Sequence, residues 1–144
     1  MVKPIRRGGL YMVKSPIPEV WTDARFKSFI VSALRGAFRR WKPKQECIKA
    51  AFTKTKVNPK TGRMCMHYKC VSCKKAFPNK EVVADHIIPI VSDKGFTTFD
   101  DWIVRGFVAQ DGFQCMCKTC HKIKSKEETL ARKLVKDKLK EGSK

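Results

Sequence analysis

The chain has 144 residues, the length of one domain with extensions, and carries 32 lysine and arginine residues against 13 aspartate and glutamate residues. The formal net charge of +19 indicates a polyanionic partner, most simply nucleic acid, although a merely well-solvated basic protein would show the same balance. No apolar run approaches the roughly 20 residues that span a bilayer, and no signal-peptide core is present, so we expect a cytoplasmic, reducing setting.

The positive charge is concentrated toward the two ends of the chain. Residues 1–69 contain 17 basic and 3 acidic side chains, and residues 122–144 contain 9 and 4. Residues 70–121 are neutral, with 6 of each. The flanks are therefore suited to a phosphate backbone, whereas the middle offers the acids that a cation site needs.

Residues 1–20 combine glycine, proline and several cations, which predicts an extended or partly disordered basic arm. Residues 22–41 are predicted to form a helix that Thr22 or Asp23 caps and whose apolar stripe packs on a core. The basic residues of this region are interpreted either as a solvated surface or as phosphate contacts. The candidate DNA-binding residues here are Arg25, Arg35, Arg39, Arg40 and Lys42.

The remaining elements are predicted from turn signals, periodicity and capping patterns. Pro43 ends the first helix and opens a second, and a turn is expected over 58–62. Ser125 and Glu128 have the spacing of a capping box, so a separate final helix is expected to begin there. The predicted elements are helices over about 44–53, 99–108, 118–124 and 125–140, and strands over 64–69 and 81–88.

Two CxxC pairs, Cys70/Cys73 and Cys117/Cys120, form a candidate structural zinc site. The two-residue gap lets both sulfurs of a pair reach one ion, and zinc favours tetrahedral thiolate coordination. The alternative is four reduced cysteines that behave as small apolar residues. Cys115 competes as a ligand on position alone, whereas Cys47 and Cys65 are interpreted as packing residues.

Asp85-His86 and His121 are the candidate chemical residues. A neutral histidine can take a proton from water near pH 7, and a carboxylate with one further ligand can hold a divalent cation. Adjacent residues of a strand point to opposite faces, but near a strand end or bulge Asp85 could still bind a metal while His86 addresses water. Each residue also has a bland interpretation: the Asp-His pair as a capped surface histidine, and His121 as an exposed residue or a fourth zinc ligand.

In combination, these residues resemble the HNH endonuclease family, and most closely the small HNH proteins of bacteriophages, some of them homing-type nucleases. The resemblance covers about residues 57–130 and rests on Cys70-x-x-Cys73, Asp85-His86-Ile87-Ile88-Pro89, Gln114, Cys117-x-x-Cys120-His121 and Lys124. It implies an α+β fold whose ββα-metal core is a two-stranded antiparallel hairpin followed by a helix. A basic arm (1–20) and a basic helical extension (21–56) would precede this core, and a charged helix or tail (131–144) would follow it.

The resemblance also implies a function, the hydrolysis of DNA phosphodiester bonds by nicking or double-strand cleavage. His86 would be the general base, Asp85 and His121 would bind a catalytic Mg2+ or Mn2+, and the four cysteines would bind structural Zn2+. Lys122 and Lys124 would contact phosphates of double-stranded DNA, with a solvated charge run as the alternative. The asparagine that the family pattern expects near position 112 is missing, and Asp111 is the candidate structural brace in its place.

Three interpretations of the function remain. The chain is interpreted either as a nuclease or as a zinc-stabilised nucleic-acid-binding module that has lost catalysis. A third interpretation is an accessory factor whose weak nuclease depends on phage packaging or replication proteins in the host cytoplasm. A monomer and a homodimer both remain compatible with the sequence.

Overall fold

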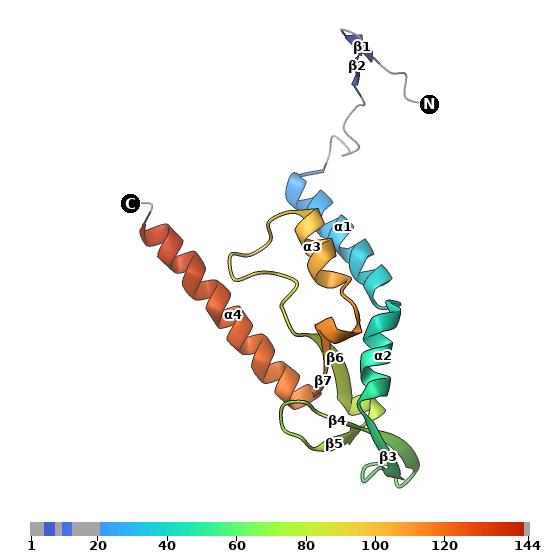
Figure 1. Cartoon of the computed structure of the whole chain (residues 1–144). Coiled ribbons are helices and arrows are strands. Elements are labelled where there is room, and N and C mark those ends of the chain that lie inside the picture. Colours follow the sequence, from blue (N-terminus) through green and yellow to red (C-terminus); the bar gives the residue numbers. More distant parts are fainter. Residues whose placement is uncertain (1–4, 8–9, 13–20, 143–144) are drawn as a thin grey trace. The chain divides into compact units, whose positions relative to one another are not determined.

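The computed structural model describes residues 5–7, 10–12 and 21–142, in an α+β fold with small antiparallel sheets (Figure 1). The predicted α+β class is therefore confirmed. The chain divides into two compact units, residues 1–36 and 37–144. In the first unit, β1 (Ile5–Arg7) and β2 (Leu10–Met12) form an antiparallel pair. The other residues of the predicted arm over 1–20 lie outside the described residues.

Helix α1 (Asp23–Phe38) begins as predicted but ends before residue 41. Thr22 Oγ1 accepts the backbone N–H of Arg25 at 3.2 Å, which confirms Thr22 as the N-cap. No residue of this fully described helix is buried. The predicted core packing of the apolar stripe is confirmed at its end, where Phe38 and Trp41 pack against the core of the second unit.

Helix α2 (Lys42–Ala50) has Pro43 in its first turn, as predicted, because proline has no N–H to leave unsatisfied there. The helix ends before Phe52. The prediction that it continues to about residue 53 is therefore wrong. Residues 52–53 begin β3 (Phe52–Val57), which pairs with β4 (Met64–Lys69), and β4 pairs with β5 (Ala76–Pro78). All six residues of β3 are exposed. A strand with no buried side lacks the alternation by which the sequence would reveal it.

The second sheet pairs β6 (Val82–His86) with β7 (Phe113–Cys117) in antiparallel register. Burial alternates along β6, so that Val82, Ala84 and His86 face the core and Asp85 faces away from it. The predicted opposite orientation of Asp85 and His86 is thereby confirmed.

A single helix, α4 (Lys118–Glu141), follows β7 directly (Figure 1). The predicted break between 124 and 125 is wrong. Ser125 lies inside the helix, where its backbone carbonyl accepts the hydroxyl of Thr129 at 2.8 Å. The flanking lysine, glutamate, leucine and alanine residues are strong helix formers, and they outweigh a capping pattern that nothing else supports. The start of α4 is capped by Cys117 Sγ, which accepts the N–H of Cys120 at 3.4 Å.

Helix α3 (Phe99–Gly106) lies between β6 and β7 in sequence, and Thr98 caps it by accepting the N–H of Asp101 at 3.1 Å. The core of the second unit joins α2 to both sheets. Its buried residues are Cys47, Tyr68, Val82, Ala84, Phe113 and Cys115. Burial raises the pKa of Cys47, and raises that of Cys115 to about 11, so both thiols stay neutral packing groups. No helix in the described part of the chain is long and apolar enough to cross a bilayer.

Candidate metal centres

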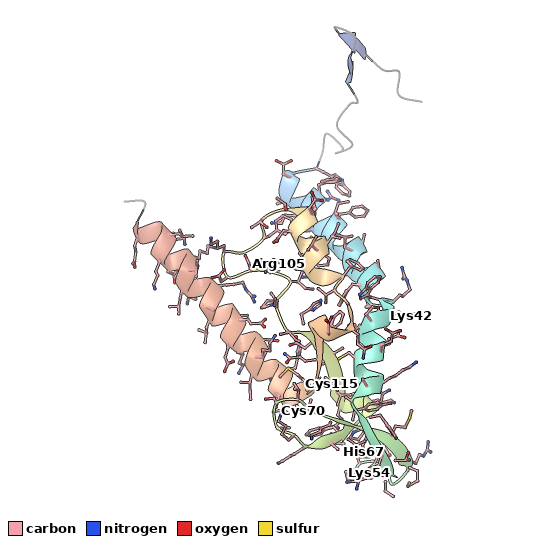
Figure 2. The ribbon with its side chains drawn as sticks, in the orientation of Figure 1. Lys42, Lys54, His67, Cys70, Arg105 and Cys115 are labelled. Atoms are coloured by element: carbon pink, nitrogen blue, oxygen red, sulfur yellow. The ribbon has the colours of Figure 1, made fainter. Side chains whose placement is uncertain are left out.

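The four cysteines of the two CxxC pairs form one cluster. Their sulfur atoms all lie within 4.8 Å of one another, which would allow a single ion such as zinc to bind all four. Cys70 and Cys73 belong to the turn between β4 and β5, Cys117 ends β7, and Cys120 lies in the first turn of α4. Figure 2 shows Cys70 beside the start of α4. The predicted ligand set is therefore brought together, and Cys115 lies in the hydrophobic core instead.

The turn that carries Cys70 and Cys73 is shaped by its backbone. Cys70 N–H donates to Lys75 O at 2.9 Å, and Lys74 N–H donates to Cys70 O at 3.0 Å. Lys74 has a φ of 62°, the left-handed conformation that this tight return requires. Val71 N–H donates to Cys115 O at 2.8 Å, which connects the turn to β7.

The electrostatics of the cluster favour a bound cation. Burial opposes ionisation of Cys70, but hydrogen bonds from the backbone of Cys117, Cys73 and Ser72 lower the pKa of its thiol to about 6. Burial, together with the neighbouring Cys70, raises the pKa of Cys117 to about 12. Thiols this close cannot all ionise unless a positive charge compensates them. The donor set thus fits a structural zinc ion, whose charge would allow all four thiolates to form.

A second candidate centre lies on the outer face of β6. Asp85 Oδ1 lies 3.5 Å from His121 Nε2, a separation that one metal ion bound to both atoms could bridge. The antiparallel register places Gln114 opposite Asp85, and Gln114 Nε2 donates to Asp85 Oδ2 at 3.1 Å. His121 immediately follows Cys120, so its position on α4 depends on the cysteine cluster. These residues come together as expected from the sequence.

Lys124 makes contacts inside this centre. Its Nζ atom lies 2.8 Å from Asp85 Oδ2, 2.8 Å from the backbone oxygen of His86 and 2.5 Å from Glu128 Oε1. Burial opposes its protonation, but the two carboxylates more than offset this and raise the pKa of Lys124. Glu128 was not among the predicted site residues. Its signal was present in the i,i+4 spacing from Lys124, which places the two side chains on one helix face.

His86 lies on the inner face of β6, against aromatic rings. Phe38 stacks on the imidazole with a centroid distance of 5.0 Å, and Phe113 lies at 4.7 Å. His86 Nε2 lies 2.9 Å from the carbonyl oxygen of Gly106. Because a carbonyl only accepts, Nε2 must carry the proton in the neutral ring, which leaves the lone pair on Nδ1.

The environment of His86 favours this neutral form. Burial is the largest influence and lowers the pKa of the ring, with Lys44 and Lys124 acting in the same direction. The Gly106 carbonyl and Asp85 oppose this shift without reversing it. In the described part of the chain, no buried side-chain nitrogen or oxygen lacks a hydrogen-bond partner. The hydrogen bond to Gly106 uses Nε2, which leaves Nδ1 as the ring nitrogen that can accept a proton.

The position where the family pattern expects an asparagine lies in a crowded turn before β7. A Cβ atom at Gly112 would lie 2.5 Å from Val108 Cγ2, so an asparagine could not enter without a shift of Val108. Ile87 N–H donates to Gly112 O at 3.0 Å, which connects this turn to the end of β6 through the main chain. Asp111 is exposed in the short 3-10 turn Gln110–Gly112, and its role as a brace stays a prediction.

The candidate DNA-binding residues of the N-terminal half are exposed. Arg25 and Arg35 lie on α1, and Arg39 and Arg40 lie in the connection to α2. Lys42 begins α2 (Figure 2). Arg25 stacks over Trp21 at 4.7 Å. On α4, Lys122 is exposed, whereas Lys124 is held by the contacts above.

No protein-family model matches the chain, and no curated protein or solved structure matches it.

Proposed function

We propose that the protein is a divalent-metal-dependent endonuclease of the HNH type that hydrolyses phosphodiester bonds of double-stranded DNA. One observation carries the proposal. Asp85 and His121 pair on the outer face at the end of β6, while the adjacent His86 offers a neutral imidazole from the inner face. A carboxylate–imidazole pair that can hold a metal ion and a neutral imidazole that can accept a proton are the groups that metal-assisted hydrolysis requires.

Asp85 and His121 would hold the catalytic ion. Oxygen and imidazole ligands accept Mg2+ or Mn2+, and the 3.5 Å between Oδ1 and Nε2 is compatible with a shared ion. When bound, such an ion would offset the charge that develops on the phosphate and its leaving oxygen. Gln114 keeps the carboxylate oriented by its bond to Oδ2.

His86 would accept the proton of the attacking water at Nδ1. The carbonyl of Gly106 holds the opposite side of the ring and stabilises the imidazolium formed after proton transfer. Phe38 and Phe113 restrict the orientation of the ring, so less orientational freedom is lost when it reaches a productive geometry. The lowered pKa of His86 keeps the ring available as a base at neutral pH.

DNA would be held by the positive surface of the chain. Exposed Arg39, Arg40 and Lys42 can contact phosphates, and such contacts supply affinity without sequence readout. A monomer that cuts one strand at a time and a homodimer that cuts both are equally compatible with this arrangement.

A second candidate function is a zinc-stabilised nucleic-acid-binding module. The observation that favours it is the ion pair between Lys124 and Asp85, because the carboxylate is then neutralised without a divalent ion. The cysteine cluster and the basic surface would serve that function unchanged. Dependence of weak nuclease activity on a phage packaging or replication protein is a further form of the same alternative.

The deciding experiment is cleavage of supercoiled plasmid by the wild type and by His86→Ala, each with EDTA alone, Mg2+ or Mn2+. We expect nicked or linear DNA only with a divalent ion and intact His86, and a loss of at least about 100-fold in rate in the variant. Zinc content and DNA affinity should be unchanged.

The matched control is His67→Ala, which removes the other buried histidine, on β4. It should retain metal-dependent cleavage when folded. Cleavage by His86→Ala at the wild-type rate would refute the assigned base. Tight DNA binding without cleavage under any metal would favour the binding module.

A further inference from the structure

The ammonium group of Lys124 is surrounded by three oxygen atoms from different parts of the fold. They are Asp85 Oδ2 on β6 at 2.8 Å, the backbone oxygen of His86 at 2.8 Å and Glu128 Oε1 on α4 at 2.5 Å. A lysine ammonium has three N–H donors, and each has an acceptor here. The side chains of Lys124, Asp85 and Glu128 are only 22%, 14% and 24% exposed.

This oxygen cage has the chemistry of a cation site. Two carboxylates and a main-chain carbonyl are ligands that hard divalent ions prefer, and here a monovalent ammonium group takes that place. Asp85 and Glu128 would repel each other in a partly buried site without a positive charge between them. Lys124 therefore stabilises the ion-free arrangement of the same carboxylate that the proposed function assigns to the divalent ion.

We propose that Lys124 is a resident cation that competes with the divalent ion for Asp85 and thereby keeps the affinity of the site for metal low. This inference rests on the proposed function for the identity of the metal ligands. Two like charges near one carboxylate repel each other, and a divalent ion beside Asp85 must either displace the ammonium group or bind against its field. Lys124 is then a positioning residue that regulates metal loading, instead of the phosphate contact expected from the sequence.

A purely structural tether would behave differently when removed. If Lys124 only fixed β6 to α4, its loss would loosen Asp85 and weaken metal binding or leave it unchanged. If Lys124 competes with the ion, its loss frees Oδ2 and removes a positive charge, and metal binding becomes tighter. The direction of the change in metal affinity therefore distinguishes the two roles.

The experiment measures Mn2+ binding to the zinc-loaded full chain without DNA, from the electron paramagnetic resonance signal of free Mn2+. We expect Lys124→Met to bind Mn2+ about tenfold more tightly than the wild type. Lys124→Gln should act in the same direction, because its amide keeps two N–H donors for the oxygen cage while removing the charge. The matched control is Lys133→Met, an exposed lysine farther along α4, which should change Mn2+ affinity less than about twofold.

A further variant, Asp85→Asn combined with Lys124→Met, should lose the gained affinity if the ion binds at Asp85. Unchanged or weaker Mn2+ binding in both Lys124 variants would overturn the inference, as would loss of bound zinc in both. A wild type that neither binds Mn2+ nor cleaves DNA would contradict the proposed nuclease. An Asp85-dependent gain of Mn2+ binding in Lys124→Met would support the competing role even then.

Discussion

Lys74 shows how one residue can determine the shape of a metal-binding turn. Its φ of 62° is a conformation that costs an L-residue roughly 1–2 kcal/mol and is most unfavourable for β-branched side chains. We expect Lys74→Val to lower the free energy of unfolding by about that amount and to weaken zinc retention, whereas Lys74→Gly should preserve both. Urea unfolding combined with a zinc-release assay measures the two effects. Equal stability of the two variants would contradict this account of the turn.

Gly112 occupies the position where the family pattern expects an asparagine, and Val108 leaves no room there for a side chain. A Cβ at this position would lie 2.5 Å from Val108 Cγ2, so Gly112→Ala should destabilise the protein by about 1–3 kcal/mol. Val108→Ala combined with Gly112→Ala should recover part of this loss because the clashing atoms are removed. Urea unfolding of the single and double variants gives the coupling. Gly36→Ala on α1 is the control, since a Cβ there meets nothing within 4 Å.

At the residue scale, the sequence predicted which side chains come together better than it predicted which backbone atoms contact them. The four cysteines come together as expected, and Asp85 lies beside His121. The Gly106 carbonyl at His86 was not predictable, because a backbone oxygen has no signature in the sequence. Lys124 was expected to contact phosphates because the resemblance placed it on the helix that carries His121, with a solvated charge run as the alternative. Only the fold brings Asp85 to it.

At the element scale, apolar periodicity indicated α1, whereas turn signals and β-branched content indicated β4 and β6. β6 and β4 lie within or at the predicted strands, and α1 to α3 differ from prediction mainly at their ends. β7 was not predicted because four of its five residues are apolar or cysteine, Gln114 being the exception, and such a short run does not distinguish a strand from a buried helix. The predicted break in α4 at Ser125 is wrong because the helix propensity of the surrounding residues outweighs the local capping pattern.

The cysteine cluster connects three elements, so its loss should affect more than one of them. We expect Cys73→Ser to release the structural metal and to lower the melting temperature by more than about 5 °C, because metal binding contributes to folding in small domains. Zinc stoichiometry and circular dichroism melting measure this. Cys65→Ser, which alters a cysteine outside the cluster, should keep the metal. Loss of zinc in both variants would mean that the cluster is assigned incorrectly.

At the scale of the whole molecule, the proposed DNA binding should depend on net charge. Neutralising Arg39, Arg40 and Lys42 to alanine should reduce the salt dependence of binding, with the slope of log K against log salt decreasing by about 0.9 for each phosphate that the variant no longer neutralises. Fluorescence anisotropy in EDTA measures binding without cleavage. The matched control neutralises three exposed lysines of α4, Lys133, Lys136 and Lys140. Equal losses of affinity in both triple variants would indicate a diffuse charge effect instead of a defined basic surface.

The four-cysteine cluster also affects how readily the chain between its two CxxC pairs can become longer. An ion held by Cys70, Cys73, Cys117 and Cys120 would close a loop of the intervening chain, and the entropy of loop closure grows only with the logarithm of length. Doubling such a loop costs only about 0.6 kcal/mol. Asp93 and Lys94 lie exposed within it. We therefore expect this segment to accept extra residues at little cost, while β6 stays paired with β7 and the four cysteines stay together.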